Sequence, residues 1–266
     1  MGDAVTADSY LKGLFGLHGR TAVVIGGTGV LGSAFCEALA GAGAHTVVAG
    51  RDRSRGEDCV HRLTSGGGSA EFFPADCTSR KDLESLVAHL TRANRSTDVL
   101  VNGAGINAAT PFLEITDDEW DRILNVNLRG VRLACQVFGK YMIQRSTRGS
   151  IINVASLSGI TPLSRVFTYS ATKAAVINLT QNLAREWASV GIRVNALSPG
   201  FFPAEQNKAI LTDERIENVM RHTPLKRFGL PKELAGAILF LASPNAGSFV
   251  TGANIVVDGG FSSMTI

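Results

Sequence analysis

The chain has 266 residues and a formal charge of +3, and its Lys and Arg residues are scattered rather than clustered. This pattern argues against a basic nucleic-acid-binding face and leaves only a weak bias toward small anionic molecules. Apolar residues make up 45% of the chain, yet no stretch approaches the ~18 unbroken apolar residues that a membrane helix needs. We therefore expect neither nucleic acid nor membrane as a partner.

The segment from Met1 to Arg20 lacks the continuous apolar core of a signal peptide. The four cysteines and five histidines show no metal-binding spacing. We therefore expect a cytoplasmic protein with reduced thiols and no metal site.

Short β-rich runs alternate with longer amphipathic stretches along the chain. The predicted strands are Thr21–Ile25, Thr46–Ala49, Ala70–Phe73, Asp98–Val101, Ser150–Val154, Arg193–Leu197 and Asn254–Val257. The first six each precede a segment long enough for a helix, which indicates a parallel sheet covered on both faces. With right-handed crossovers, this order predicts an α/β fold, a doubly wound Rossmann domain with a seven-stranded parallel sheet.

No linker, low-complexity tract or internal repeat divides the chain, so we expect one domain over residues 1–266. Residues 1–19 would be an N-terminal extension, and about 200–230 would form the substrate-binding loop and helices. Ligands of a doubly wound sheet bind at the carboxyl ends of its strands, so functional residues are expected in the loops that follow them.

The loop after the first strand reads Ile25-Gly26-Gly27-Thr28-Gly29-Val30-Leu31-Gly32. Gly27, Gly29 and Gly32 form a GxGxxG that follows a strand and opens a helix. Glycine lets backbone N–H groups approach a pyrophosphate, and the helix N-terminus adds a positive end. A glycine-rich turn can also serve close packing alone. Its place after the first strand favours dinucleotide binding by the run from Gly26 to Gly32.

The end of the second strand bears on which dinucleotide binds. An acid there would accept from a ribose 2′-hydroxyl, but the chain reads Ala49-Gly50-Arg51-Asp52. Arg51 could pair with a 2′-phosphate, or it could be a solvated arginine that Asp52 neutralises. NADP(H) is favoured, and NAD(H) is the alternative. Further along, Asp76 could accept from the adenine amino group, and the turn Asn102-Gly103-Ala104 could bring backbone close to the cofactor.

Tyr169 and Lys173 stand at i and i+4 and so share one helix face. A phenol with a pKa of ~10 is a poor base at neutral pH, and a nearby ammonium lowers that value. Ser156 follows the fifth strand, where its hydroxyl could donate to a developing alkoxide.

These features together resemble a classical short-chain dehydrogenase/reductase, and the resemblance covers nearly the whole chain. The segments that carry it are the glycine loop, Asn102-Gly-Ala-Gly105, Asn127-Leu-Arg-Gly130, Ser156, Tyr169-Ser-Ala-Thr-Lys173, Arg193-Val-Asn195, Pro199-Gly200, Thr251-Gly252 and Asp258-Gly-Gly260. The resemblance implies a Rossmann fold, a catalytic tetrad and a homotetramer, with a homodimer as the alternative. The tetrad would be Asn127, Ser156, Tyr169 and Lys173.

By the same resemblance, Asn127 would hold a water in the proton relay, and Lys173 would also contact the nicotinamide ribose. Additional cofactor contacts are expected at Cys77, Pro199, Gly200 and Phe202. Two positions depart from the family pattern: Val30 stands where the usual middle glycine falls, and Ala204 replaces a threonine that often contacts the carboxamide.

The segments Pro199–Asn207 and His222–Gly229 resemble D-mannonate (fructuronate) oxidoreductases of this family, whereas the short loop after Gly105 is more like gluconate 5-dehydrogenases and general ketone reductases. A sugar acid needs a cation for its carboxylate, and Arg165 could supply it or could lie at a subunit contact. Gln206 and Asn207 are candidates for its hydroxyls, beside Ser156 and Tyr169.

The sequence thus predicts an NAD(P)-dependent oxidoreductase that interconverts a secondary alcohol and a ketone, with a sugar acid or polyol as the small-molecule substrate. A 3-oxoacyl-type or general ketone reductase of the same family is one alternative. A non-catalytic dinucleotide-binding sensor or scaffold is an alternative from another class. The physiological substrate and the reaction direction stay open.

Overall fold

The computed structural model describes residues 6–202 and 212–264. Within these ranges, seven parallel strands form one sheet in the order β3-β2-β1-β4-β5-β6-β7. The strands are β1 (Thr21–Ile25), β2 (His45–Gly50), β3 (Ser69–Pro74), β4 (Val99–Asn102), β5 (Ser150–Val154), β6 (Arg193–Pro199) and β7 (Asn254–Val257). The order reverses between β1 and β4, so the predicted doubly wound Rossmann sheet is confirmed.

Three of the predicted strands have the observed bounds; β2, β3 and β4 differ by one residue at each end, and β6 differs by two residues at its C-terminal end. The largest difference is at β6, which continues through Ser198 and Pro199 because both pair with β7. Asp98 lies just before β4, and its carboxylate accepts from the backbone N–H of Thr21 and from the Arg20 guanidinium. These differences come from pairing and side-chain contacts that a single-strand pattern does not contain.

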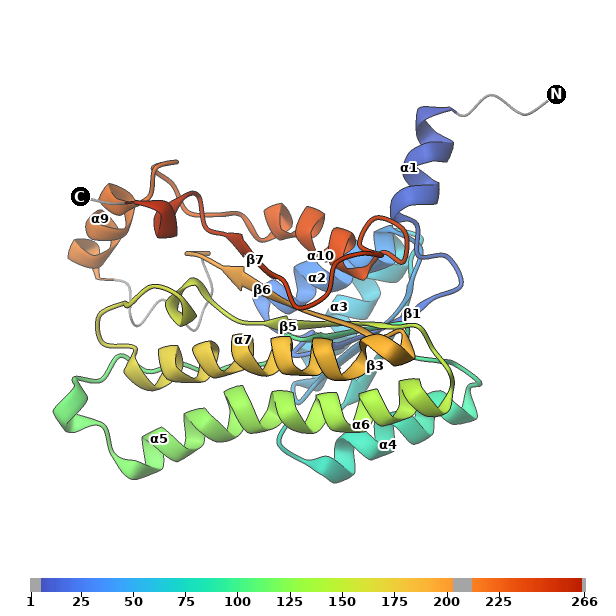
Figure 1. Ribbon diagram of the computed structural model, residues 1–266, viewed down its shortest axis with the longest axis horizontal. Helices are drawn as coiled ribbons and strands as arrows, with labels where there is room; N and C mark the ends of the chain where they lie inside the picture. The colour runs from blue at the N-terminus through green and yellow to red at the C-terminus, as the bar shows by residue number, and fades with distance from the viewer. Residues whose placement is uncertain (1–5, 203–211, 265–266) are drawn as a thin grey trace.

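Helices cover both faces of the sheet (Figure 1). One layer contains α4 (Arg80–Arg92), α5 (Asp117–Leu124), α6 (Gly130–Gln144) and α7 (Phe167–Trp187), and the other contains α2 (Val30–Gly41), α3 (Arg53–Ser65) and α10 (Ala235–Ala242). Alternate residues of β1 enter opposite cores: Val23 packs with the first layer, and Val24 with the second. Strands that are buried on both faces explain their unbroken apolar runs.

Helix α1 (Ala7–Phe15) projects from the body of the molecule and has no buried residue (Figure 1). Its C-terminal end is fixed by two hydrogen bonds, from Ser243 Oγ to the Leu14 carbonyl at 2.6 Å and from Asn245 Nδ2 to the Gly13 carbonyl at 2.7 Å. Within the described residues, the expected N-terminal extension therefore contains a helix that is hydrogen-bonded to the rest of the fold near its C-terminal end.

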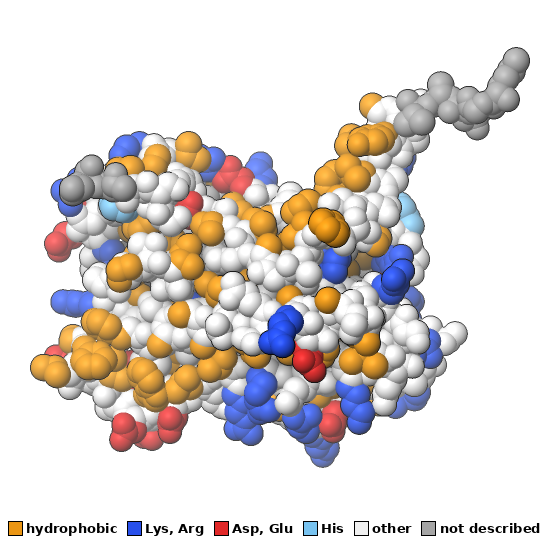
Figure 2. Space-filling model, in the orientation of Figure 1, with side chains coloured by type: hydrophobic (Ala, Val, Ile, Leu, Met, Phe, Trp, Pro, Cys, Tyr) orange, Lys and Arg blue, Asp and Glu red, His pale blue; other side chains and the backbone are white. Residues whose placement is uncertain are grey.

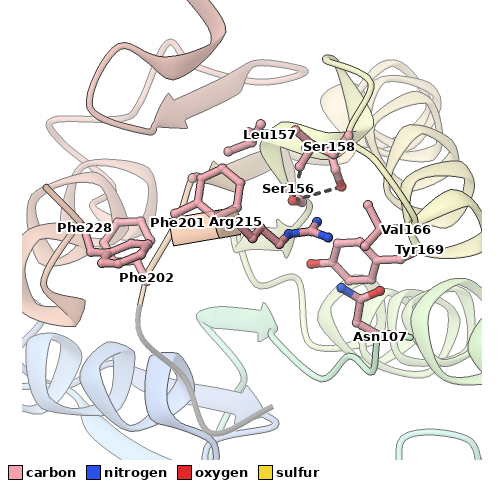
Figure 3. Close-up of a pocket in the computed structure, with 12 residues that line it drawn as sticks. Asn107, Ser156, Leu157, Ser158, Val166, Tyr169, Phe201, Phe202, Arg215 and Phe228 are labelled. Carbon is pink, nitrogen blue, oxygen red and sulfur yellow. Dashed lines mark hydrogen bonds between the residues drawn. The ribbon is translucent and has the colours of Figure 1, made fainter. Parts of the chain in front are cut away.

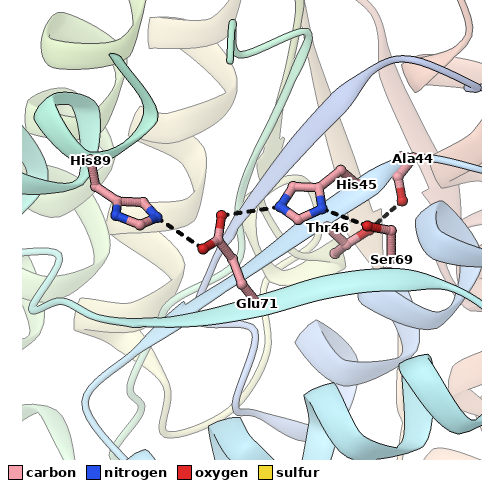
Figure 4. A network of polar contacts seen from close by, with 6 residues as sticks. All are labelled: Ala44, His45, Thr46, Ser69, Glu71 and His89. Atoms are coloured by element: carbon pink, nitrogen blue, oxygen red, sulfur yellow. Dashed lines mark hydrogen bonds and ion pairs between the residues drawn. The ribbon is translucent and has the colours of Figure 1, made fainter. Parts of the chain in front are cut away.

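A polar network lies at the beginning of β2 and β3, at the edge of the sheet (Figure 4). The Glu71 carboxylate on β3 accepts from His45 Nε2 at 3.0 Å and from His89 Nε2 at 2.9 Å. Burial alone would raise the pKa of Glu71, but the hydrogen bonds from the two histidines outweigh it and hold the pKa below its ordinary value. The network joins β2, β3 and α4.

Glu71→Gln is expected to lower the free energy of unfolding by about 1 kcal/mol at pH 7, since one charge-assisted acceptor is lost. Because the folded state depresses the pKa of Glu71, this stabilisation exists above the unfolded pKa of ~4.3 and is lost as the pH falls through the folded pKa. Urea unfolding at several pH values should show the difference shrinking below about pH 4. The exposed Glu57→Gln is the control, and a difference that is constant with pH would contradict the assignment.

Candidate active site

The glycine loop between β1 and α2 is built around two positions that admit no side chain. Gly26 has a φ of +81°, and a Cβ there would lie 2.6 Å from the Ala104 backbone nitrogen. A Cβ at Gly32 would lie 2.0 Å from the Gly26 carbonyl oxygen. Gly29, by contrast, would meet only that same oxygen, at 3.4 Å. Gly26 and Gly32 therefore let the helix pack against the loop, and Gly29 leaves its outer side open.

A cleft of about 460 Å³ runs over the carboxyl ends of the strands. Sixteen of the predicted cofactor residues line it: Gly26, Thr28, Gly29, Val30, Leu31, Gly32, Arg51, Asp76, Cys77, Gly103, Ala104, Tyr169, Lys173, Pro199, Gly200 and Phe202. Its volume is in the range of small-molecule sites. Val30 is the first residue of α2 and is 38% exposed. The departure from the family glycine therefore places an apolar, branched side chain on the cleft wall.

Two predicted cofactor residues, Gly27 and Asn102, are not among the residues that line this cleft. Gly27 faces the interior, where a Cβ would lie 3.0 Å from Val48 Cγ1 and 3.2 Å from Cys36 Sγ. The Asn102 side chain also turns inward, and its Nδ2 donates to Asn153 Oδ1 at 2.8 Å. Both residues lie behind the cleft wall. Gly27 allows the loop to pack closely on Val48 and Cys36, and Asn102 joins the end of β4 to β5.

The end of the cleft beside β2 carries two arginines. Arg51 is exposed, and its Nη1 lies 4.0 Å from Asp76 Oδ2. Asp52, which could have neutralised Arg51, instead caps α3: it accepts from the Arg55 backbone N–H at 3.0 Å, and its other oxygen lies 3.4 Å from Arg55 Nε. Asp76 Oδ1 accepts from Thr78. In this corner Arg51 therefore lies near Asp76, whereas Asp52, its neighbour in sequence, lies beside Arg55.

Arg55 and the residues Ile106, Asn107 and Val154 also line the cleft, and the sequence reasoning did not single them out. Arg55 could have been found, because it follows Arg51 by only four residues and lies in the first turn of α3. The other three follow or end β4 and β5, where no motif distinguishes a lining residue from its neighbours.

Helix α7 carries both Tyr169 and Lys173. The Lys173 side chain is nearly fully buried, with 3% of its surface exposed, and its Nζ donates to the Val154 carbonyl at 2.7 Å. Burial lowers the pKa of the Lys173 ammonium to about 8. Nζ lies 5.4 Å from the centre of the Tyr169 ring, so a positive charge here stands beside the phenol.

Ser156 and Tyr169 form the second half of the site. Burial raises the pKa of the Tyr169 phenol, and its hydrogen bond with Ser156 opposes that rise. Ser156 Oγ also accepts from the Ser158 backbone N–H at 3.2 Å and from Ser158 Oγ at 3.1 Å. Because Ser156 acts as the acceptor in these two bonds, its own hydrogen can be donated to the Tyr169 oxygen or to a substrate oxygen bound in front of it.

Asn127 is fully buried in a π-helical turn, η2 (Asn125–Arg129), between α5 and α6. Its Oδ1 accepts from the Ile106 N–H at 2.8 Å, its Nδ2 donates to the Ile106 carbonyl at 2.9 Å, and Nδ2 also donates to Thr172 Oγ1. The side-chain amide thus fixes the loop after β4 against α7. The relay water expected at Asn127 stays a prediction and would need another atom of this residue.

A smaller pocket opens beside the cleft and shares Ser156 and Tyr169 with it (Figure 3). Arg215 reaches this pocket from α9 (Asp213–His222). Arg165, the predicted carboxylate partner, is exposed, has a φ of +62°, and is not among the residues that line the pocket. Gln206, Asn207 and Ala204 lie outside the described residues. The described site thus presents a different arginine from the one expected.

No group of three or more His, Cys, Asp or Glu side chains among the described residues is arranged to hold a metal ion. The four cysteines Cys36, Cys59, Cys77 and Cys135 are free thiols. Within the same ranges, no helix combines the length and apolar character needed to cross a membrane.

A glycine loop at a helix N-terminus, opening into a cleft that ends on a Tyr–Lys–Ser group, defines a dinucleotide-dependent oxidoreductase. A family model described as "Enoyl-(Acyl carrier protein) reductase" matches residues 28–262. The chain belongs to the short-chain dehydrogenase/reductase family and is an NAD(P)-dependent oxidoreductase. The resemblance stated from the motifs is therefore confirmed.

Several sugar-metabolising relatives match almost the whole chain. It is 40% identical to galactitol 2-dehydrogenase of Rhizobium johnstonii over 93% of this chain and 96% of the relative. Gluconate 5-dehydrogenase of Gluconobacter oxydans is 34% identical over 93% and 96%. The structure of a gluconate 5-dehydrogenase from Burkholderia cenocepacia, in complex with NADP and tartrate, superposes with a TM-score of 0.91 at 32% identity, covering 96% and 100%.

Lys173→Met is expected to abolish turnover and to stabilise the fold at pH 7. Burial lowers the pKa of Lys173 from ~10.4 in the unfolded chain to about 8 in the folded one. At pH 7 the group is protonated in both states, so folding buries an ammonium at a cost on the order of 3 kcal/mol. Losing the bond to Val154 offsets about 1–2 kcal/mol of that gain.

Urea unfolding should therefore show Lys173→Met more stable than the parent by about 1 kcal/mol at pH 7, and less stable above about pH 10.5, where the charge is absent in both states. The exposed Lys140→Met is the matched control and should change neither stability nor turnover. A destabilised Lys173→Met at pH 7 would show that the buried ammonium is not a burden on the fold.

Proposed function

We propose that the protein interconverts a secondary alcohol of a sugar acid or polyol with the corresponding ketone. The observation that carries this proposal is the shared wall of the two cavities, in which Ser156 and Tyr169 line both the large cleft and the smaller pocket. A substrate oxygen placed at that wall meets a hydroxyl donor and a phenol at once. The named activities of the galactitol and gluconate relatives support a polyhydroxy substrate.

In the oxidation direction, the Tyr169 phenolate accepts the proton of the substrate hydroxyl, and Ser156 donates a hydrogen bond to the oxygen as its negative charge grows. The Lys173 ammonium stabilises the phenolate, which offsets the rise in the phenol pKa that burial causes. The nicotinamide, when bound, takes up or supplies the hydride. In the reverse direction, Tyr169 returns the proton to the new alcohol.

We propose NADP(H) as the preferred cofactor, with NAD(H) as the alternative. Arg51 and Arg55 line the cleft beside the end of β2, where an acid would be expected to repel a 2′-phosphate. Two guanidinium groups at this corner suit a phosphate. The Burkholderia relative holds NADP. Asp76, next to this corner, is the candidate for the adenine amino group.

A ketone reductase of 3-oxoacyl or broader type is the second candidate. The small pocket has an apolar side formed by Leu157, Val166, Phe201, Phe202 and Phe228, which could accept an aliphatic group. The family description also refers to an acyl carrier protein.

We also propose that the protein is a single-domain cytoplasmic enzyme that assembles with further copies of itself, as a homotetramer or alternatively a homodimer. Figure 2 shows hydrophobic side chains along the projecting α1, where Tyr10 and Leu11 are more than half exposed. A nine-residue helix is marginal when nothing packs on it. Further exposed apolar residues in the C-terminal third are Leu225, Leu230, Phe249, Val256 and Met264. A second copy is the occupant that would cover such surfaces.

Tyr169→Phe is expected to reduce turnover at least about 1,000-fold on every accepted alcohol or ketone, because no other group replaces the proton donor. NADPH binding by calorimetry should stay within about 3-fold of the parent, since the ring is kept. Turnover is followed through the absorbance of the reduced nicotinamide with a panel of sugar acids, polyols and ketones. A variant that retained most of its turnover would refute the proposed chemistry.

Arg51→Asp is expected to weaken NADPH binding about 10- to 100-fold, because a charge-assisted phosphate contact is replaced by repulsion. NADH binding should change by less than about 3-fold. Calorimetric titration of both cofactors measures this, with Arg53→Asp as the control, since Arg53 is exposed on the same helix end and does not line the cleft. Equal losses for the two cofactors would remove Arg51 from the phosphate corner.

A further inference from the structure

Arg215 is a cation at the substrate pocket that has no ion pair with any acid among the described residues. Its Nη2 donates to the Ser164 carbonyl at 3.1 Å, and its backbone N–H donates to Thr212 Oγ1 at 3.3 Å. The residue is partly buried. A guanidinium has five N–H donors, and a single carbonyl leaves most of them without a partner in the described chain.

The surroundings of Arg215 add positive potential instead of compensating its charge. Arg215 is the third residue of α9, and the N-terminus of a helix normally favours negative groups. Burial and, after it, the charge of nearby Arg165 lower the pKa of Arg215. The two acids of the same turn, Asp213 and Glu214, are exposed. This arrangement is unfavourable for the free protein unless an anion enters the pocket.

The pocket places this cation opposite the catalytic hydroxyls. In Figure 3 the Arg215 guanidinium is directed toward the hydroxyl end of Tyr169, with the Asn107 amide on the other side of that ring. Asn107 Oδ1 accepts from the Ala108 N–H at 2.8 Å. The Nδ2 atom is therefore the part of this amide that can donate to a ligand in the pocket. The pocket thus combines a planar cation, an amide donor and Ser156 around one small volume.

We propose that Arg215 is the residue that selects a carboxylate-bearing substrate, by binding the carboxylate of a sugar acid while Ser156 and Tyr169 hold the reacting hydroxyl. This inference rests on the proposed function and narrows its substrate class to acids over neutral polyols. A guanidinium fork matches a carboxylate through two parallel hydrogen bonds. Similarity alone does not make this choice, because a relative with a polyol name and one with an acid name each match 93% of this chain.

The test compares the parent enzyme with Arg215→Gln, which keeps a donor for the Ser164 carbonyl but removes the charge. For D-gluconate, kcat/KM should fall about 100-fold, mainly through KM, whereas kcat/KM for galactitol should stay within about 3-fold. Arg215→Lys should restore part of the loss on the acid. Arg221→Gln, an exposed arginine of the same helix, is the matched control and should change neither value.

A binding measurement separates this inference from the proposed function. Tartrate, a hydroxy acid, is titrated calorimetrically into the NADPH-saturated protein; the parent should bind it, and Arg215→Gln should bind it at least about 30-fold more weakly. If tartrate binding depends on Arg215 but no alcohol or ketone is turned over, the anion site is supported. The proposed interconversion of a sugar acid or polyol with its ketone is then refuted.

Three results would overturn the assignment to Arg215. The first is an equal loss on gluconate and galactitol, which would indicate a structural role through Ser164. The second is tartrate binding that is absent from the parent or unchanged in Arg215→Gln. The third is a selective loss on the acid in Arg165→Gln instead of Arg215→Gln, which would give the role to Arg165.

Discussion

The Lys173 ammonium lies almost without solvent contact at the carboxyl end of β5, where Nζ donates to the Val154 carbonyl at 2.7 Å. Burial of a charge is unfavourable, and here it lowers the pKa of the group to about 8. The fold tolerates this because Lys173 is held by the longest helix of the first layer and by the end of a central strand. The same position places Lys173 Nζ 5.4 Å from the centre of the Tyr169 ring. The buried position of Lys173 thus both destabilises its own charge and brings that charge beside the phenol that it activates.

Asn127 extends this restraint to the neighbouring loop. Its amide joins the Ile106 backbone to Thr172, and Thr172 Oγ1 in turn donates to the Tyr169 carbonyl at 2.6 Å. The loop after β4, the π-helical turn and α7 are therefore connected through one buried side chain. A π-helical turn is less favourable than an α-helical one and often occurs at functional sites. Here the π-helical turn carries Asn127, whose amide makes both hydrogen bonds to the Ile106 backbone.

The strands and the loops after them could be predicted from the sequence because their signals are local: apolar runs, glycines and a Tyr–Lys pair on one helix face. The roles of Gly27, Asn102 and Arg215 could not, because they depend on contacts between distant segments. Gly27 has the motif spacing but packs against Val48 and Cys36. Arg215 lies on α9, which follows β6 along the chain. Nothing in the sequence of that helical turn distinguishes Arg215 from a surface arginine. Arg165 is predicted from its position four residues before Tyr169, and the structure places it near Arg215 but not among the residues that line the pocket.

The placement of Arg215 also separates selectivity from chemistry. Ser156, Tyr169 and Lys173 stand at the end of β5 and on α7, both packed in the core, so their geometry depends on the whole sheet. Arg215 stands on α9, whose described contacts with that core are few: Val219 is its single buried residue. A change on α9 can therefore alter which substrate is bound without moving the hydroxyls that react.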